Sequence, residues 1–302
     1  MGRVSGSARG DSMKVLVIGA TGLLGNAIVH VGKQRGNDII GMARRGTQCS
    51  VDLGMPEQLI ETVTAIRPDV VVNAAAIVSL GACESDPGTA YCINGRPSSI
   101  LSQLSGVIGF KLVYVSTDHY YCGDGPLSHD EASPITLVNE YARTKYIGES
   151  FTALAAGSLV LRTNIVGHRW REGAPAFAEW VIGALTRREP LTLFDDVFTS
   201  SIHVDVFAEA MFDMLAKNAA GTYNLASSEV SSKRDFVLAL ADQLGIDPDW
   251  ATTGSGKALA PPRANSMGLA VGKAEALLGY RLPGLKETVS RLAQEWRRGR
   301  PV

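Results

Sequence analysis

The chain has 302 residues, 45% of them hydrophobic and 20% charged, a composition typical of a globular protein that can bury a large core. The 29 basic and 30 acidic residues nearly cancel, and no apolar run is long enough to span a bilayer, so neither nucleic acid nor a membrane is expected as a partner. The four cysteines show no metal-binding spacing, which argues against a metal site or disulfide scaffold and favours reduced thiols in a cytoplasmic protein.

The N-terminal half alternates between short apolar runs and segments of helical period. Before it, residues 1–12 are rich in Gly, Ser and Arg, and we expect them to form a disordered tail. Alternation of strands and helices predicts an α/β fold with a Rossmann-like, doubly wound parallel sheet. The expected strands are 14–18, 38–43, 70–72, 112–115 and 157–161, and the expected helices are 23–33 and 56–66.

The alternation loosens after residue 165, where helical patterns dominate. These patterns predict a smaller, mostly helical C-terminal substrate lobe. The expected helices are 176–185, 204–215, 233–244, 273–278 and 285–296, with one strand at 222–225. We therefore expect a dinucleotide-binding domain made of residues 13–165 plus 200–225. The substrate-binding lobe would comprise residues 166–199 plus 226–302.

A glycine-rich turn joins the first expected strand to the first expected helix. Its first glycine permits a tight turn, its second lets backbone N–H groups approach a pyrophosphate, and its third allows close helix–strand packing. The bare pattern is weak, but its position between a buried strand and a helix favours dinucleotide binding over a purely structural turn. The turn residues expected to bind the cofactor are Gly19, Thr21, Gly22, Leu23, Leu24 and Gly25.

The end of the second expected strand indicates which dinucleotide binds. NAD-preferring sites place a carboxylate there, whereas this chain has Arg44 and Arg45. Guanidinium groups suit a 2′-phosphate, so we favour NADPH as the cofactor, with NADH as the alternative. Alternatively, the two arginines are a solvated pair in a loop. Asp52 and Leu53 follow and are expected against the adenine, unless they form an acidic surface turn.

A tyrosine and a lysine share one face of a helix expected to begin near Asn139. Tyr141 and Lys145 are four residues apart, and a nearby ammonium would lower the pKa of the phenol towards neutrality. The tyrosine would then be a usable general acid. Thr117 closes the strand at 112–115, where its hydroxyl could stabilise charge on a substrate carbonyl oxygen.

With these motifs the chain resembles the extended short-chain dehydrogenase/reductase superfamily, and more narrowly the dTDP-4-dehydrorhamnose reductase group. The resemblance extends from Met13 to the C-terminus. Besides the glycine turn it rests on Asn73-Ala74-Ala75-Ala76, Cys83-Glu84, Asn94, Ser116-Thr117-Asp118, Asn139-x-Tyr141-x-x-x-Lys145 and Pro262-Arg263-x-Asn265-Ser266.

The resemblance implies NAD(P)H-dependent reduction of the 4-keto group of a nucleotide-activated deoxysugar, with a homodimer as one option. It implies that Thr117 holds the keto oxygen, that Tyr141 donates the proton, and that Lys145 binds the nicotinamide ribose and tunes Tyr141. Further cofactor contacts would come from Ala74, Ala75, Ala76 and Asn94, and substrate contacts from Ser116, Asp118, His119, Asn164, Arg263, Asn265 and Ser266.

Two departures from the family's usual sequence leave the identity of the sugar open. His119 stands where the family usually has tyrosine, and Asn164-Ile165 replaces a Ser-Trp pair. Two other functions remain alternatives. One is an epimerase or dehydratase that retains NAD, against which Arg44 and Arg45 argue. The other is a non-catalytic regulatory subunit of the same fold, against which the intact Tyr141 and Lys145 argue.

Overall fold

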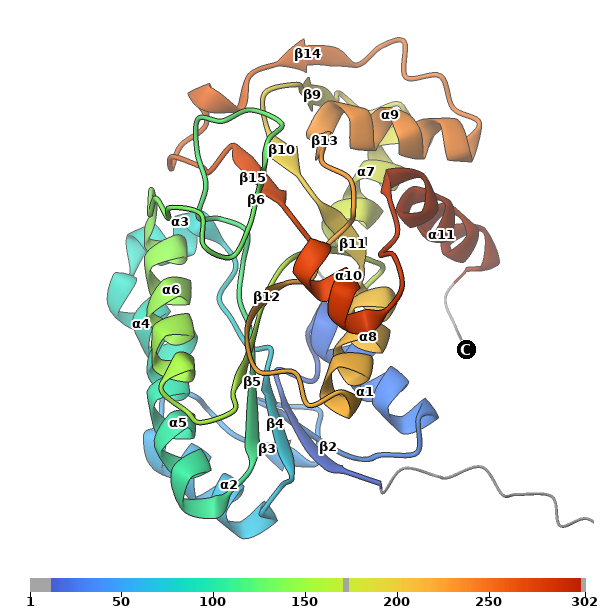
Figure 1. Cartoon of the computed structure of the whole chain (residues 1–302). Coiled ribbons are helices and arrows are strands. Elements are labelled where there is room, and N and C mark those ends of the chain that lie inside the picture. The colour runs from blue at the N-terminus through green and yellow to red at the C-terminus, as the bar shows by residue number, and fades with distance from the viewer. Residues whose placement is uncertain (1–11, 171–173, 300–302) are drawn as a thin grey trace, which may run out of the picture.

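A seven-stranded parallel sheet forms the centre of the computed structural model, which describes residues 12–170 and 174–299 (Figure 1). The strand order is β12-β7-β5-β4-β1-β2-β3, and each neighbouring pair is parallel. The order reverses between β1 and β4, which confirms the predicted doubly wound sheet. The strands are β1 (Lys14–Ile18), β2 (Asp38–Ala43), β3 (Cys49–Ser50), β4 (Val70–Asn73), β5 (Lys111–Val115), β7 (Leu159–Arg162) and β12 (Gly221–Asn224). Residues 1–11 of the expected tail lie outside the described residues.

Helices cover both faces of this sheet because side chains alternate along each buried strand. Val15 and Val17 of β1 face one core, which includes α1 (Leu23–Gln34) and α8 (Val204–Ala216). Leu16 and Ile18 face the opposite core, which includes α2 (Pro56–Ile66) and α5 (Arg96–Ile108). The sheet is therefore buried on both sides, as its nearly continuous apolar strands predict.

Three helices between β4 and β5 were not predicted from the sequence: α3 (Leu80–Ser85), α4 (Pro87–Asn94) and α5. Asp86 caps α4 by accepting a hydrogen bond from Thr89 N at 2.9 Å, and Pro87 occupies the first helical position. Gly95 separates α4 from α5. The helix α6 (Glu140–Ala153) packs against α4 and α5.

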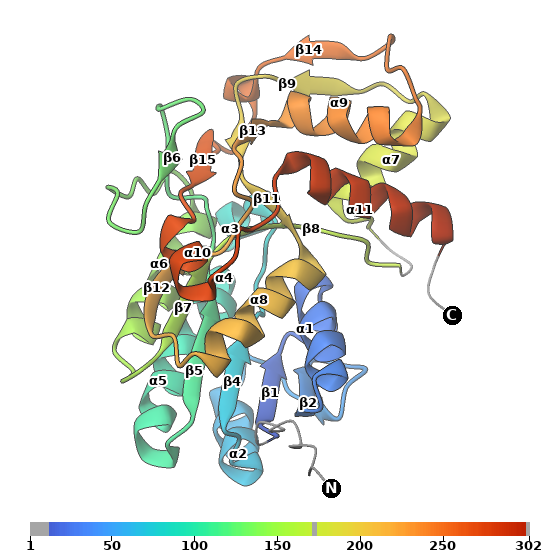
Figure 2. The same ribbon diagram turned by 45° about the vertical axis from the view of Figure 1, so that its right-hand side comes forward.

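A second core lies at the end of the sheet where α7 (Phe177–Arg187), α9 (Lys233–Leu244) and α11 (Leu285–Arg298) meet (Figure 2). Short strands form three smaller sheets, with the orders β13-β10-β15-β6, β11-β8 and β14-β9. They are β6 (Ser128–His129), β8 (Asn164–Val166), β9 (Thr192–Phe194), β10 (Phe198–Thr199), β11 (Ser201–His203), β13 (Ser231–Ser232), β14 (Thr252–Gly254) and β15 (Ser266–Leu269). A 3-10 helix spans Gly256–Ala258. By contrast, α10 (Gly272–Leu278) packs on the core of the large sheet through Ala274 and Leu278.

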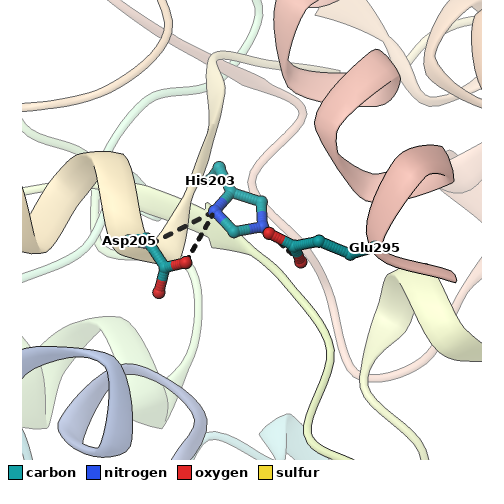
Figure 3. A group of neighbouring side chains, drawn as sticks. All are labelled: His203, Asp205 and Glu295. Atoms are coloured by element: carbon teal, nitrogen blue, oxygen red, sulfur yellow. Dashed lines mark hydrogen bonds and ion pairs between the residues drawn. The ribbon is translucent and has the colours of Figure 1, made fainter. Parts of the chain in front are cut away.

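A polar link joins α8 to α11 (Figure 3). His203 Nδ1 accepts a hydrogen bond from Asp205 N at 3.2 Å, and its Nε2 lies 3.0 Å from Glu295 Oε2. Arg291 bridges the two carboxylates, with 2.8 Å to Asp205 and 3.2 Å to Glu295. His203, Asp205 and Glu295 are close enough to chelate a metal ion, but these bonds already satisfy them. We therefore assign the group a structural role.

None of the helices in the described parts of the chain combines the length and the apolar character needed to cross a bilayer.

Gly25 allows α1 to pack directly on the turn that precedes it. A Cβ atom at this position would lie 2.1 Å from Gly19 O. We expect Gly25→Ala to lower the free energy of unfolding by about 1–3 kcal/mol, because backbone rather than a flexible side chain would have to move. Gly106→Ala in α5 is the matched control, since nothing lies within 4 Å of its Cβ position. It should stabilise by about 0.5–1 kcal/mol. Urea unfolding measures both, and equal effects would contradict the packing argument.

Candidate active site

A cavity of about 660 Å³ opens at the carboxyl ends of β1, β2 and β4, where the strand order reverses. Ligands of doubly wound sheets bind at this point. The lining includes nine of the residues expected to bind the cofactor: Gly19, Thr21, Gly22, Arg44, Asp52, Leu53, Ala74, Ala75 and Ala76.

The glycine turn forms the floor of this cavity. Gly19 has φ +85°, and a Cβ there would lie 2.8 Å from Ala75 N, so a side chain is excluded by both backbone conformation and space. Gly22 N donates to Gly19 O at 2.9 Å and closes the turn. Gly22 is the N-cap of α1 and provides no side-chain cap, which leaves backbone N–H groups of the first helical turn for a ligand. A bare-backbone cradle at a helix N-terminus fits a pyrophosphate.

Two of the turn residues expected to bind the cofactor also pack inside the fold. Leu24 is 6% exposed and packs among the buried side chains between α1 and the sheet. Gly25 contacts the backbone of Gly19 rather than the cavity. Their expected cofactor contacts stay predictions.

The arginines that follow β2 face a common space. A second cavity of about 880 Å³ is lined by Thr21, Arg44, Arg45, Gly46 and Asp52. Arg44 and Asp52 line the first cavity as well, so the two spaces adjoin. This arrangement fits a phosphate held by Arg44 and Arg45 beside the adenosine end of a dinucleotide.

Thr117, Tyr141 and Lys145 are nearly inaccessible to solvent, with exposed fractions of 3%, 8% and 3%. Asn139 starts α6, which carries Tyr141 and Lys145: its Oδ1 accepts a hydrogen bond from Ala142 N at 2.8 Å, and its amide donates to Pro262 O at 3.0 Å. The cap thereby fixes α6 relative to the segment that holds Arg263, Asn265 and Ser266.

The expected effect of Lys145 on Tyr141 is wrong in this structure. Burial raises the pKa of Tyr141 to about 12, and the Thr117 side chain only partly opposes the rise. The Lys145 ammonium donates to Val115 O at 2.6 Å and lies over the Tyr114 ring. Burial lowers the pKa of Lys145 to about 7. Helical spacing places both residues on one face, but long-range partners decide where the ammonium lies.

Asp118, His119 and Asn164 gather around Tyr141. Asn164 Nδ2 donates to Asp118 Oδ2 at 2.8 Å, and the edge of the His119 ring contacts Tyr141 with 5.2 Å between centroids. Burial raises the pKa of Asp118 to about 7, against the effect of the Asn164 hydrogen bond. Burial lowers the pKa of His119 to about 4, with added effects of nearby positive charges, one of them on Arg263. His119 is therefore neutral at physiological pH.

The side chains of Ser116 and Asn94 form buried hydrogen bonds within the fold. Ser116 Oγ donates to Glu149 Oε2 at 2.7 Å in a buried network. The Asn94 side chain accepts from Ile77 N at 2.7 Å and donates to Ile77 O and Thr144 Oγ1. The expected contacts of Ser116 with substrate and of Asn94 with cofactor stay predictions.

Asn265 and Ser266 likewise anchor a loop. Asn265 Oδ1 accepts from Gly123 N at 3.0 Å, and Ser266 Oγ donates to Gly125 O at 2.8 Å. Arg263, two residues before Asn265, is exposed. The expected substrate contacts of Arg263, Asn265 and Ser266 stay predictions.

Ten cavity residues were not predicted from the sequence; Thr89, Cys92 and Ile93 among them lie on α4, which was not predicted either. They share no motif, and they are Ile18, Met42, Ala43, Val51, Gly54, Ile77, Thr89, Cys92, Ile93 and Arg169. The neighbouring Arg96 was missed as well; it donates to Gly54 O at 2.8 Å and holds the loop beside the cavity.

Comparison with known proteins places these features in a family. The family model of the RmlD substrate binding domain matches residues 13–298. The spore coat polysaccharide biosynthesis protein SpsK of Bacillus subtilis is 28% identical over 236 residues, which cover 78% of this chain and 80% of that protein. The dTDP-4-dehydrorhamnose reductase of Escherichia coli is 28% identical over 237 residues, covering 76% and 78%.

A solved structure shows the same fold. The dTDP-4-dehydrorhamnose reductase of Bacillus anthracis, crystallised in complex with NADP, superimposes with a TM-score of 0.82. It is 23% identical, and the match covers 93% of this chain and 98% of that one.

Proposed function

Because the chain belongs to the RmlD substrate binding domain family, we propose that it is an NADPH-dependent oxidoreductase that reduces the 4-keto group of a nucleotide-activated deoxysugar. One observation carries the proposal. The cavity over the glycine turn and the buried group of Thr117 and Tyr141 both lie at the carboxyl end of one parallel sheet. A dinucleotide site and a proton donor at the same sheet edge are the two parts that carbonyl reduction needs.

The described residues fit NADPH. Gly19 and Gly22 would hold the pyrophosphate, Arg44 and Arg45 the 2′-phosphate, and Asp52 with Leu53 the adenine. Lys145 would bind the nicotinamide ribose. When bound, NADPH supplies the hydride that the keto carbon gains.

The chain supplies the proton. Thr117 and Tyr141 would hold the keto oxygen by hydrogen bonds, and the phenol O–H would pass its proton to that oxygen as negative charge develops on it. Because the pKa of Tyr141 is about 12, the phenol keeps its proton at neutral pH until the substrate oxygen becomes basic. The oxygen thus ends as a hydroxyl and Tyr141 as a phenolate, which solvent reprotonates.

We propose the same two functional regions as the sequence predicts. Residues 13–165 plus 200–225 would bind the cofactor, and 166–199 plus 226–302 the sugar nucleotide, with Asp118, His119, Asn164 and Arg263 at the boundary. Residues 271–282 belong to the second region in the chain but pack against the first, because Val271, Ala274 and Leu278 are part of the core of the large sheet.

The test follows the loss of NADPH absorbance across a panel of nucleotide-linked 4-ketosugars, with NADH in parallel. Turnover with one member supports the proposal and names the sugar. NADPH binding without reduction of any member would overturn it in favour of the regulatory or other-substrate alternatives. Release of a retained NAD on denaturation would point to the epimerase or dehydratase alternative.

Arg44→Ala combined with Arg45→Ala should weaken NADPH binding by about 10- to 100-fold while leaving NADH affinity nearly unchanged, because only NADPH carries the 2′-phosphate. Fluorescence titration of both nucleotides measures this. Arg234→Ala, at an exposed arginine of α9, is the control and should change neither affinity. Equal weakening of NADPH and NADH by the double variant would remove the 2′-phosphate assignment.

A further inference from the structure

The cofactor cavity receives one arginine from a distant part of the chain. Among its described lining residues, Arg169 alone comes from beyond residue 93; the others surround the carboxyl ends of β1, β2 and β4. It follows β8, at the start of the segment that leads to α7 and the second core. Arg44 and Arg169 are the cationic side chains among these lining residues.

The guanidinium of Arg169 has few hydrogen-bond partners within the described part of the chain. There it forms no ion pair, and its Nη1 makes a long hydrogen bond of 3.5 Å to Ala174 O. Its Nε is buried without a hydrogen-bond partner. Arg169 as a whole is partly exposed, so an anion that enters the cavity can reach the guanidinium and supply the partner that its buried Nε lacks.

The backbone that carries this guanidinium is held firmly. Glu179 Oε1 accepts hydrogen bonds from Arg169 N at 2.8 Å and from Trp170 N at 2.9 Å, while its Oε2 accepts from Ala176 N at 2.7 Å. The Trp170 ring stacks on Trp296 of α11. The Glu179 carboxylate is therefore committed to the backbone and orients Arg169 without pairing with its guanidinium. Such preorganisation favours binding of an external anion.

We propose that Arg169 binds the pyrophosphate of the dinucleotide, opposite the glycine turn. The glycine turn offers only partial charges, and Arg44 is committed to the adenosine end, so Arg169 would supply the full positive charge that a diphosphate needs. Cofactor binding would then connect the large sheet to the segment that begins the second core. The inference rests on the proposed cofactor site.

The test compares the dissociation constants of NADPH and NADH for the wild type, Arg169→Met and Arg169→Lys, measured by fluorescence titration or calorimetry without substrate. Because both nucleotides contain the pyrophosphate, Arg169→Met should weaken both by about 10- to 100-fold. Arg169→Lys keeps the charge and should recover much of the loss. This pattern differs from that of the Arg44 and Arg45 double variant, which should affect NADPH alone. Arg234→Met is the control for loss of an arginine elsewhere.

The outcomes separate the two proposals. If the wild type binds neither nucleotide, the proposed function fails. If the wild type binds both and Arg169→Met binds them equally well, only the Arg169 assignment is overturned. The assignment is also overturned if affinity falls together with the unfolding temperature of the ligand-free protein, because the side chain would then act through the fold.

Discussion

Tyr141→Phe should lower kcat for sugar reduction by about 100- to 10,000-fold, the usual contribution of a positioned general acid. The substitution removes one oxygen and keeps the ring that packs beside Cys83 and Ala90. NADPH affinity should be nearly unchanged, because the phenol is proposed to act on the substrate oxygen. Steady-state kinetics give kcat, and a separate titration gives the cofactor affinity.

The matched control is Tyr146→Phe, on the same helix. Tyr146 is half-buried, and its ring contacts Tyr120 rather than the proposed substrate position. It should retain nearly full activity. A Tyr141→Phe variant as active as this control would refute the proton donor, whereas loss of activity in both would trace the effect to α6.

Glu149→Gln should reduce the free energy of unfolding by about 3–5 kcal/mol, because it leaves a buried guanidinium without its counter-charge. Glu149 and Arg162 are 7% and 5% exposed and lie 2.6 Å apart. Burial alone would lower the pKa of Arg162, but the hydrogen bonds and charge of Glu149 outweigh it and raise that pKa. Ser116 and Tyr121 complete the network. Chemical denaturation measures the loss.

Glu189→Gln provides the control, since Glu189 pairs with Arg187 at an exposed site where solvent screens both charges. It should cost a small fraction of the loss at Glu149. If the two variants are equally stable, the buried pair contributes no more than the surface pair. Because only the folded protein is active, Glu149→Gln should also reduce activity in proportion to the fraction unfolded.

The sequence predicts those parts of the fold in which one local pattern dominates. Residues 15–18 of β1 are continuously apolar and are followed by a glycine turn, so both β1 and α1 could be predicted with nearly their observed bounds. The segment from α3 to α5 could not, because Pro87, Gly95 and Pro97 interrupt its helical period. Strands of two or three residues, such as β6 and β10, exist only because a distant strand pairs with them.

The candidate site divides in the same way. Thr117 could be assigned because it follows a buried strand, and Tyr141 because it shares a helical face with Lys145. The position of the Lys145 ammonium depends on Val115 O, and the cavity position of Arg169 depends on Glu179, ten residues further along the chain. No pattern of residue types encodes such partners, since they depend on the finished tertiary structure.

The placement of β12 and α10 has a consequence for biosynthesis. Apart from Arg169, the described cavity lining lies within the first 93 residues, so the ribosome releases most of the cofactor cradle early. The edge strand β12 and the covering helix α10 emerge much later, after residues 220 and 271. Until then, Leu159 and Leu161 of β7 lack the contacts that β12 and the rest of the completed core provide. The nascent chain therefore exposes an apolar sheet edge while it grows, a period in which chaperone binding would protect it from aggregation.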